Sequence, residues 1–484
     1  RRWGAAALAL APWALAYALL SAMPEPGGAR ELRLAWEGAL PLAGWTVWIY
    51  SAAYPLALAA PLLIDRRRDL RRFVLSAWGI TLAGFAAMLL LPGRAALLPV
   101  PATGAPAWLF SANRALDAEW LACPSFHAAW SVLAACAIAD RRPRLRWPAA
   151  ALAFLVCASC LTTGSHALAD VAAGALLGVA AWHQGALWRR MVGAAERLAN
   201  AWSAVQVGPV RVIGHAPWSA LAAAAGMLVV VRLSGPERIP AAAAVFAAGL
   251  LAAGAWGHVL EGGGRLSRPF GYYGFLFGAL AALAGLAAFD AGGALRLAAA
   301  FAVGAPLAQA LGRLRCLVQG CCHGRPARSV PGLRVIHPMS RVTALAGLRG
   351  VAIHPTQLYS LVGNLAVFAV LARLWEAGTP ANFVGGAYLL LSSQVRFVEE
   401  QYRGEPQTPV RCGLAVYQWL AVGVFVAGIL VTMLAGPGVA AAAPLTTGGV
   451  LLSGAAGLCA ALFMSVDFPG SRRRFSRLTV GSPE

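Results

Sequence analysis

The chain has 484 residues, of which 59% are hydrophobic and only 12% are charged. Soluble proteins carry about 25% charged residues, so this composition excludes an ordinary soluble globular protein. The formal net charge of +20 would favour nucleic-acid binding in a soluble protein. Here the arginines gather in short loops between apolar segments, as the positive-inside rule describes for membrane proteins, and we expect no nucleic-acid partner.

Apolar stretches of about 17 to 25 residues, the length that spans a bilayer, recur along the whole chain. The first follows Arg1 and Arg2 and is expected to be a retained helix rather than a cleaved signal peptide. We predict an all-α polytopic membrane protein with about 14 transmembrane helices in two bundles. The predicted segments are 4–22, 41–64, 73–92, 124–140, 147–163, 166–188, 216–232, 239–260, 271–290, 296–311, 355–375, 382–397, 415–435 and 445–466.

A polar stretch interrupts this pattern and predicts the domain boundary. We assign residues 1–190 to a six-helix module, residues 191–215 to a connector, and residues 216–484 to a second membrane module. No internal repeat relates the two modules, so we expect two different folds rather than a duplication.

Arginine placement also predicts the topology of the first module. The loops 65–72 and 141–146 are rich in arginine and are expected on the cytoplasmic side. The intervening loop 93–123 and the junction 163–166 then lie on the opposite side. Two groups of candidate catalytic residues fall at that second side.

Ser125 and His127 open one predicted helix, and His166 and Asp170 open another. The i, i+4 spacing places the imidazole and the carboxylate on one helical face. A carboxylate on one ring nitrogen makes the other a better nucleophile, while a second histidine can protonate a leaving oxygen, which suits phosphoryl transfer. Each histidine alone is compatible with a helix cap or an interfacial position. Their occurrence on one side of the membrane favours a site, since ionisable groups at that depth are costly.

The motifs around these residues resemble the type 2 phosphatidic acid phosphatase (PAP2) superfamily, in particular its inositol-phosphorylceramide-synthase-like branch. The resemblance rests on 124–127 (PSFH), on 162–166 (TTGSH) and on Asp170. It implies a six-helix fold in which His166 attacks phosphorus, Asp170 orients it, His127 is the general acid and Ser125 contacts the phosphate.

The chain departs from that family in its phosphate-binding arginines. No Lys-x6-Arg-Pro motif precedes Pro124, and Cys160 stands where the third motif carries arginine. Arginine supplies bidentate phosphate contacts. The nearby candidates for this role are Arg114 and Arg94 in the loop 93–123, and the alternative is that they are ordinary solvated loop arginines.

The second module carries polar groups that are unusual beside membrane helices and that mark a candidate site. They lie in 312–316 (GRLRC), 320–324 (GCCHG), 354–359 (HPTQLY) and 396–403 (RFVEEQYR). The hexapeptide 354–359 together with 396–403 is similar to prolipoprotein diacylglyceryl transferase. That family moves the diacylglyceryl group of phosphatidylglycerol onto the lipobox cysteine of a preprolipoprotein.

Carried over, this resemblance implies His354 and Glu400 as catalytic residues. Glu399 is equally well explained as a solvated helix end. The glycines between Gly271 and Gly278 are expected to let lipid approach the backbone. The expected substrate-binding residues are Tyr273, Arg313, Gln357, Tyr359, Arg396 and Arg403.

Two departures accompany this second resemblance. Tyr273 begins the sequence Tyr-Gly-Phe where the family has His-Gly-Gly, and Cys316 and Cys321 stand at signature-loop positions that hold Asn and Glu. The run Cys316-x4-Cys321-Cys322-His323 also raises a zinc site, because thiolate and imidazole are zinc's preferred ligands. The spacing differs from Cys-x2-Cys and adjacent cysteines rarely chelate one ion, so we expect no metal and no cofactor.

These observations predict a multi-pass enzyme of a bacterial cytoplasmic membrane that modifies phospholipids. The expected partners are phosphatidylglycerol, with phosphatidic acid and polyprenyl phosphates as further candidates, and preprolipoproteins. The alternative is a non-catalytic lipid-binding or lipid-moving protein on decayed enzyme folds. The intact His127, His166 and Asp170 favour the enzyme, whereas the missing arginines and Tyr273 favour the alternative.

Overall fold

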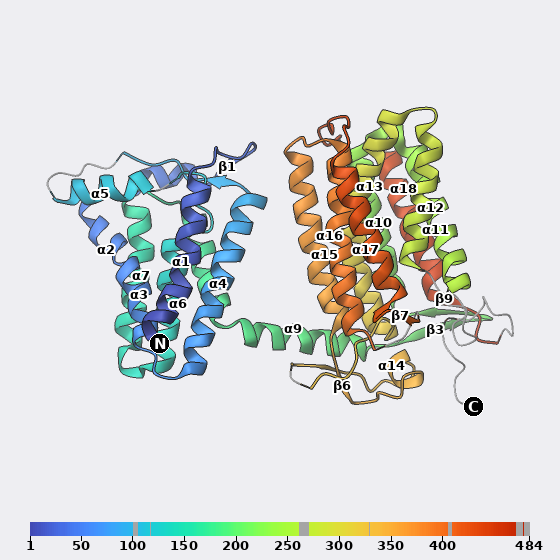
Figure 1. Cartoon of the computed structure of the whole chain (residues 1–484), viewed down its shortest axis with the longest axis horizontal. Coiled ribbons are helices and arrows are strands. Elements are labelled where there is room, and N and C mark those ends of the chain that lie inside the picture. Colours follow the sequence, from blue (N-terminus) through green and yellow to red (C-terminus); the bar gives the residue numbers. More distant parts are fainter. Residues whose placement is uncertain are drawn as a thin grey trace. The chain divides into compact units, whose positions relative to one another are not determined.

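The computed structural model describes residues 1–99, 105–116, 118–260, 271–328, 330–404, 409–470 and 478. It divides into two compact units, Arg1–Trp188 and Arg189–Glu484 (Figure 1). Helices build both units, and the strands are short, so the predicted all-α polytopic fold is confirmed. Within the described ranges, 8 helices are long and apolar enough to cross a membrane. Each of the predicted apolar segments coincides with one or more helices.

The first unit is a helical bundle with one small strand pair. The segment 41–64 is broken into short helices rather than forming one span. The helices are α1 (Arg2–Ser21), α2 (Val47–Ser51), α3 (Ala53–Leu62), α4 (Arg67–Leu90), α5 (Ala105–Leu116), α6 (Phe126–Arg141), α7 (Arg146–Thr162) and α8 (Leu168–Trp182), with 3₁₀ turns Ala35–Ala39, Gly44–Thr46 and Pro143–Leu145. Strands β1 (Arg30–Glu31) and β2 (Gly93–Arg94) pair in parallel.

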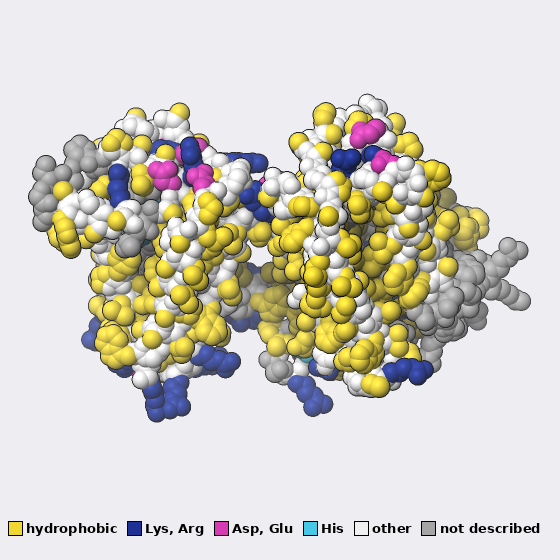
Figure 2. Space-filling view, turned by 45° about the horizontal axis from the view of Figure 1, so that its top comes forward, with side chains coloured by type: hydrophobic (Ala, Val, Ile, Leu, Met, Phe, Trp, Pro, Cys, Tyr) yellow, Lys and Arg dark blue, Asp and Glu magenta, His cyan; other side chains and the backbone are white. Residues whose placement is uncertain are grey.

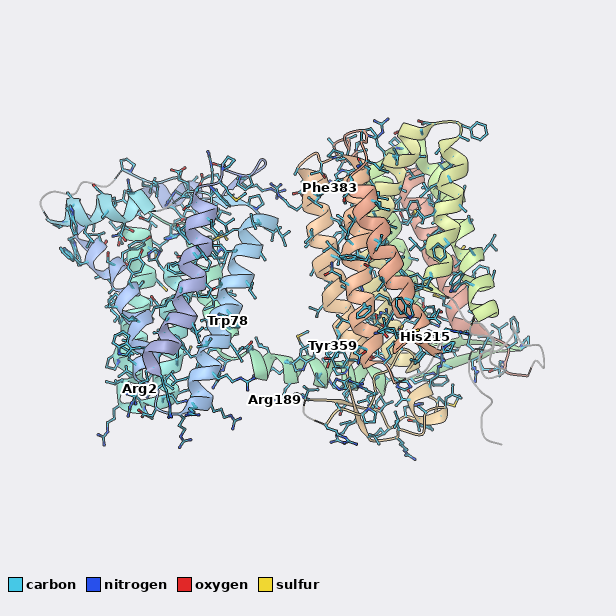
Figure 3. All side chains as sticks on the ribbon, in the orientation of Figure 1. Arg2, Trp78, Arg189, His215, Tyr359 and Phe383 are labelled. Atoms are coloured by element: carbon cyan, nitrogen blue, oxygen red, sulfur yellow. The ribbon has the colours of Figure 1, made fainter. Side chains whose placement is uncertain are left out.

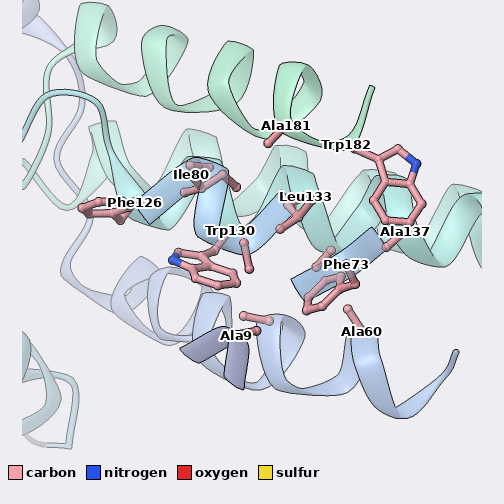
Figure 4. Close-up of a cluster of buried hydrophobic side chains, with 14 of the residues drawn as sticks. Ala9, Ala60, Phe73, Ile80, Phe126, Trp130, Leu133, Ala137, Ala181 and Trp182 are labelled. Atoms are coloured by element: carbon pink, nitrogen blue, oxygen red, sulfur yellow. The ribbon is translucent and has the colours of Figure 1, made fainter. Parts of the chain in front are cut away.

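The core of this unit lies where α1, α3, α4, α7 and α8 pack around α6. Phe126, Trp130 and Leu133 of α6 and Phe73 of α4 are buried in it, and Figure 4 shows these side chains together with Trp182 of α8. The indole of Trp13 in α1 meets Phe126 and Trp130 edge-on. Edge-to-face contacts of this kind stabilise aromatic clusters beyond the buried area, so α1 is an integral part of the bundle.

Two glycines determine how closely α6 and α8 approach. A Cβ atom on Gly174 would clash with the carbonyl oxygen of Ser125, and one on Gly178 would lie 2.5 Å from the carbonyl oxygen of Ala129. Small residues allow helix backbones to meet directly. This contact brings the first turn of α8 against the first turn of α6.

Arginines gather at the opposite end of this unit. Arg142 binds Asp65 at 2.8 Å and Arg141 binds Asp69 at 2.8 Å, and Arg2 also pairs with Asp65. Arg2 marks this end in Figure 3, and Figure 2 shows the arginines beyond flanks covered by hydrophobic side chains. The two arginine-rich loops therefore share one end, as the topology prediction requires.

The second unit is a larger helical bundle with short strands at one end. The helices are α9 (Gln184–Ala199, which begins in the first unit), α10 (Ala216–Ser234), α11 (Ile239–Leu260), α12 (Tyr272–Ala287), α13 (Ala291–Gln319), α14 (Arg341–Ala344), α15 (Thr356–Glu376), α16 (Ala381–Tyr402), α17 (Val416–Thr432) and α18 (Thr447–Ser465), with the 3₁₀ turn Pro236–Arg238. Strands β5 (Leu333–Arg334) and β6 (Ala352–Ile353) pair antiparallel, as do β7 (Val410–Arg411) and β8 (Leu414–Ala415). Tyr359 and His215 lie near one end of this bundle and Phe383 near the other (Figure 3).

The interval 191–215 contains ordered structure. It holds most of α9 and the hairpin of β3 (Ala204–Val207) and β4 (Val210–Ile213), to which β9 (Val466–Asp467) adds a third antiparallel strand. The guanidinium of Arg211 donates to both carboxylate oxygens of Asp467 at 2.9 and 2.7 Å. A two-pronged charged contact of this kind is among the strongest in proteins, and it joins this interval to the end of α18.

The glycines of α12 serve helix packing. Cβ atoms on Gly274 and Gly278 would clash with α11, at Trp256 and Ala252 respectively. These positions therefore let α11 approach α12, and the expectation that lipid uses this space is wrong for them. Gly271, one turn earlier, does line a cavity described below.

Candidate active sites

The N-terminal ends of α6 and α8 bring three of the predicted residues together. Nε2 of His166 lies 3.4 Å from the Ser125 hydroxyl, and Nδ1 of the same ring lies 3.4 Å from the Asp170 carboxylate. The other oxygen of Asp170 accepts a hydrogen bond of 3.0 Å from the Ala167 amide. Asp170 is fully buried and His166 is nearly so. The Ala167 amide holds one oxygen of the carboxylate, the other oxygen faces Nδ1 of the imidazole, and Nε2 is then directed towards Ser125.

His127 stands beside this group on α6. Its ring centroid is 5.6 Å from that of His166, and its Nε2 lies 3.2 Å from the hydroxyl of Tyr54. Tyr50 stacks on the His127 ring at 3.9 Å and places its own hydroxyl 3.4 Å from Nε2 of His166. The two histidines are therefore close enough to act on one phosphate group from adjacent positions.

Tyr50 and Tyr54 were not among the predicted site residues. They come from α2 and α3, which the sequence presents as one apolar segment. Two tyrosines four residues apart share a helical face, and a buried tyrosine usually needs a partner for its hydroxyl. This spacing is the signal that could have identified them.

Two charged residues missed by the sequence reasoning hold the loop before α8. Glu37 is fully buried, and its carboxylate accepts hydrogen bonds from the amides of Leu168 at 2.9 Å and Leu34 at 3.1 Å. A carboxylate at a helix N-terminus is stabilised by the helix dipole. Arg33 donates to the carbonyl oxygen of Gly164 at 3.1 Å, two residues before His166. No local pattern marks these residues, because both contacts join positions about 130 residues apart.

The predicted phosphate-binding arginines contact loop residues of the same unit. Arg114 donates to the carbonyl oxygen of Leu98 and its guanidinium lies 4.3 Å from the Phe110 ring centroid. Arg94 approaches Glu31 at 3.5 Å. Arg33 contacts the loop preceding His166 directly, and Arg114 reaches it through Leu98, whose amide donates to the carbonyl oxygen of Gly164 at 3.1 Å.

An apolar cleft leads to His127. Its volume is about 700 Å³, and it lies between α1, α3 and α6. Besides His127 and Tyr54, the lining is hydrophobic, with Trp3, Leu58 and Trp130 among the larger side chains. A hydrocarbon chain fits such a lining because its burial there is favourable.

In the second unit, α13 and α16 carry a buried network of charges. Glu399 accepts from Arg313 at 2.9 Å and from Arg396 at 3.2 Å. Glu400 accepts from Arg396 at 3.0 Å and from Arg403 at 3.2 Å. Only 2% of Glu399 is exposed, so its interpretation as a solvated helix end is wrong. The i, i+3 spacing to Arg396 was the available signal.

This network borders a large cavity between helices of the second unit. The cavity has a volume of about 560 Å³, and its lining includes Arg313, Arg396, Glu399 and Tyr388. The remainder is mainly apolar, from α10, α12, α13 and α16. Cavities of this size and composition are typical of ligand sites. The side chains of Arg313 and Arg396 are only 15% and 11% exposed, so both face the interior.

A second cluster lies at the ends of α15 and α16. Nδ1 of His354 is 3.1 Å from the Tyr359 hydroxyl, and the ring of Tyr402 packs 5.0 Å from the His354 centroid. Burial, followed by the positive charge of Arg325, lowers the pKa of His354 below its usual value of 6.5. A neutral imidazole can accept a proton, as a general base must.

Two other predicted residues have their polar atoms engaged within the protein. Gln357 is buried, and its amide donates to the carbonyl oxygen of Cys321 at 3.0 Å. The hydroxyl of Tyr273 donates to the carbonyl oxygen of Tyr417 at 3.1 Å. The predicted residues of the second unit therefore form an arginine–glutamate group at the cavity and a histidine–tyrosine group at the helix ends.

The cysteines near the end of α13 also come together. The sulfur atoms of Cys316, Cys321 and Cys322 all lie within 4.8 Å of one another. The spacing in the sequence argued against a shared metal site. It did not reveal that the backbone turns back between the end of α13 and Cys322, which is what brings the sulfur atoms together.

The two units match two different families. Residues 30–183 match the family model of the PAP2 superfamily, and residues 208–434 match that of prolipoprotein diacylglyceryl transferase. The chain therefore combines a PAP2-like module with a prolipoprotein diacylglyceryl transferase-like module, as the motifs predicted.

Two proteins from Clostridium species are similar to part of the chain. The phosphatidylglycerol–prolipoprotein diacylglyceryl transferase 2 of Clostridium perfringens is 27% identical over 179 residues, which cover 36% of this chain and 67% of that protein. The phosphatidylglycerol–prolipoprotein diacylglyceryl transferase of Clostridium tetani is 26% identical over 125 residues, which cover 26% of this chain and 47% of that protein.

Proposed function

Because the chain joins these two modules, we propose that it is a phospholipid-modifying enzyme of a bacterial cytoplasmic membrane with two reaction centres. The first transfers or hydrolyses a phosphoryl group through a phosphohistidine at His166. The observation that carries this proposal is the position of His166 between Asp170 and Ser125. We place this centre on the outer face, opposite the arginine-rich loops.

In this reaction, Nε2 of His166 attacks the phosphorus atom of a lipid phosphate. Asp170 keeps the Nδ1 proton in place and stabilises the positive charge that develops on the ring. The leaving oxygen takes a proton from His127, and water or an acceptor alcohol then releases the phosphoryl group from His166. The hydroxyls of Ser125 and Tyr50 are placed to donate to phosphate oxygens.

The apolar cleft beside His127 supports a lipid substrate. A chain bound between α1, α3 and α6 would place its phosphate at the two histidines, whereas a soluble phosphate ester leaves that apolar space unfilled. The candidate substrates are phosphatidic acid, phosphatidylglycerol and polyprenyl phosphates.

The test uses the purified full chain with labelled phosphatidic acid, phosphatidylglycerol and undecaprenyl diphosphate, followed by product identification. His166→Ala should abolish phosphate release. His183→Ala is the matched control, because His183 is exposed at the C-terminal end of α8, whereas His166 precedes the N-terminal end of this helix. Equal turnover by the His166→Ala variant and the unaltered chain would rule out a phosphohistidine.

The second reaction proposed is diacylglyceryl transfer from phosphatidylglycerol to a lipoprotein cysteine, with preprolipoproteins as partners. It is supported by the two Clostridium relatives and by the cavity with inward-facing Arg313 and Arg396. The arginines would hold the phosphodiester. His354 would take the thiol proton, the thiolate would attack the glyceryl carbon next to the phosphate, and the C–O bond to the phosphate would break so that glycerol phosphate leaves. Glu400 would keep Arg396 and Arg403 in position.

Incubation with labelled phosphatidylglycerol and a lipobox peptide tests this second reaction. His354→Ala should stop transfer, whereas His337→Ala, which changes a histidine stacked on Trp202, should not. Saturable lipid binding without product by the unaltered chain would instead identify a lipid-binding protein on an enzyme fold.

A further inference from the structure

The turn after α13 folds back on the helix that it leaves. Gly320 has a φ of 74° and ends α13 with a hydrogen bond of 2.9 Å from its amide to the carbonyl oxygen of Cys316. Cys322 also lies in the left-handed region, with a φ of 56°. Side chains other than glycine, asparagine and aspartate rarely adopt this conformation, and such strain is concentrated at functional sites. The two reversals bring Cys321 and Cys322 against Cys316.

Neighbouring elements hold this turn in place. The hydroxyl of Thr356 donates to the carbonyl oxygen of Cys322 at 2.7 Å, and the amide of Gln357 donates to that of Cys321 at 3.0 Å. The amide of Gly404 donates to the carbonyl oxygen of His323 at 2.9 Å. The turn is thus fixed from α15 and from the end of α16, so the three sulfur atoms are gathered before any ligand arrives.

Arginines surround the cysteines with positive charge. Arg313 and Arg315 interact electrostatically with Cys316, and Arg403 does so with Cys322. Cys316 and Cys321 are buried. Metals bind the thiolate form of cysteine, and the positive charge of these arginines offsets the negative charge that three bound thiolates bring.

We propose that Cys316, Cys321 and Cys322 bind one soft, thiophilic metal ion of the Cu⁺ and Zn²⁺ class. Metal–sulfur bonds of about 2.3 Å put ligand sulfurs roughly 4 Å apart, so sulfurs within 4.8 Å need only small shifts. Thiolates select such ions over Mg²⁺ and Ca²⁺, which prefer oxygen ligands. On binding, the three thiols release their protons to solvent and no electron is transferred.

The cysteine site borders the cavity of the second unit, whose lining includes Cys316 and Arg313, but its three sulfurs take no part in either proposed reaction. Within the described ranges, the group of possible ligands consists of these three sulfurs. Three thiolates satisfy Cu⁺, whereas Zn²⁺ needs a fourth ligand. We therefore expect tighter binding of Cu⁺ than of Zn²⁺.

The test titrates the reduced, metal-free full chain in detergent with Cu⁺, Zn²⁺ and Cd²⁺. Cd²⁺ should produce thiolate charge-transfer absorption in the ultraviolet that saturates at one ion per chain. In parallel, bound metal should protect three of the 9 cysteines from alkylation, and peptide mapping should identify them as Cys316, Cys321 and Cys322. The alkylation arm uses the unaltered chain and does not depend on the folding of any variant.

Variants complete the test. Cys321→Ser should lower the affinity for Cd²⁺ at least tenfold, whereas Cys459→Ser in α18 should leave it unchanged. Gln357→Ala should weaken binding without removing a ligand, because it releases the Cys321 carbonyl. Equal alkylation of all three thiols with and without metal would overturn the proposal, as would unchanged Cd²⁺ affinity in Cys321→Ser. A disulfide among the three cysteines in the freshly isolated chain, with no metal uptake after reduction, would also overturn it.

Discussion

Replacing Asp170 by asparagine tests whether this carboxylate orients the His166 ring for the proposed phosphoryl transfer. One oxygen of Asp170 faces Nδ1 of His166, and the other accepts from the Ala167 amide. Asparagine has one acceptor oxygen. If that oxygen keeps the Ala167 contact, the amide NH₂ faces Nδ1 and favours the tautomer protonated on Nε2, which cannot attack phosphorus.

The expected loss follows from this change of tautomer. Removing an orienting carboxylate in this way lowers turnover by roughly 10³- to 10⁴-fold in comparable sites, or about 4 to 5.5 kcal/mol of transition-state stabilisation. The assay is phosphate release from labelled lipid by the purified chain in vesicles, with thermal unfolding as the check on folding. Asp140→Asn, at the other end of α6, is the matched control. A folded Asp170→Asn variant within tenfold of the unaltered chain would refute the reasoning.

Three further predictions concern packing, lipid binding and pH. Gly174→Ala should lower phosphate release at least tenfold, because its Cβ would displace Ser125 from His166. Arg396→Lys should weaken phosphatidylglycerol binding in a vesicle-binding assay, because lysine keeps the charge but cannot contact Glu399 and Glu400 with two prongs. The acidic limb of the pH profile of diacylglyceryl transfer should lie below pH 6.5, because burial and then the charge of Arg325 lower the pKa of His354. Arg325→Gln should raise that pKa and move the acidic limb of the pH profile upward.

Each of these predictions has a control and a contrary result. Gly79→Ala introduces a methyl group with no neighbour within 4 Å, and equal loss in both glycine variants would remove the packing explanation. Unchanged lipid affinity in Arg396→Lys would show that only charge matters at this position. Arg328→Gln changes an exposed arginine of the same loop, and an identical profile shift in that variant would show that Arg325 has no specific effect on His354.

The sequence predicted features that depend on local patterns. Apolar length indicated the helices, and the i, i+4 spacing of His166 and Asp170 indicated their contact, because both properties are set by the geometry of one helix. The conversion of 41–64 into short helices was not predictable from hydropathy. For that reason the partners of the histidines, Tyr50 and Tyr54, remained unrecognised.

Contacts between segments that are distant in the sequence could not be predicted from it either. Glu37 and Arg33 reach the loop before α8 from about 130 residues away, and no periodicity encodes such contacts. The cysteine run was recognised as a possible metal site but rejected on its spacing. Spacing rules assume ordinary backbone, whereas the left-handed conformation at Cys322 reverses the chain within two residues.

The glycine contact between α6 and α8 constrains how substrate can enter the first unit. At Gly174 and Gly178 the backbone of α8 lies directly against the backbone of α6, so no side-chain rotation can increase the distance between these helices. If the site widens to admit substrate, the movement must therefore come from α1 and α3, which line the cleft on the side away from α8. We expect a lipid to slide in sideways from the bilayer along that wall, so that its hydrocarbon tail never crosses water while the phosphate leaves through the polar end.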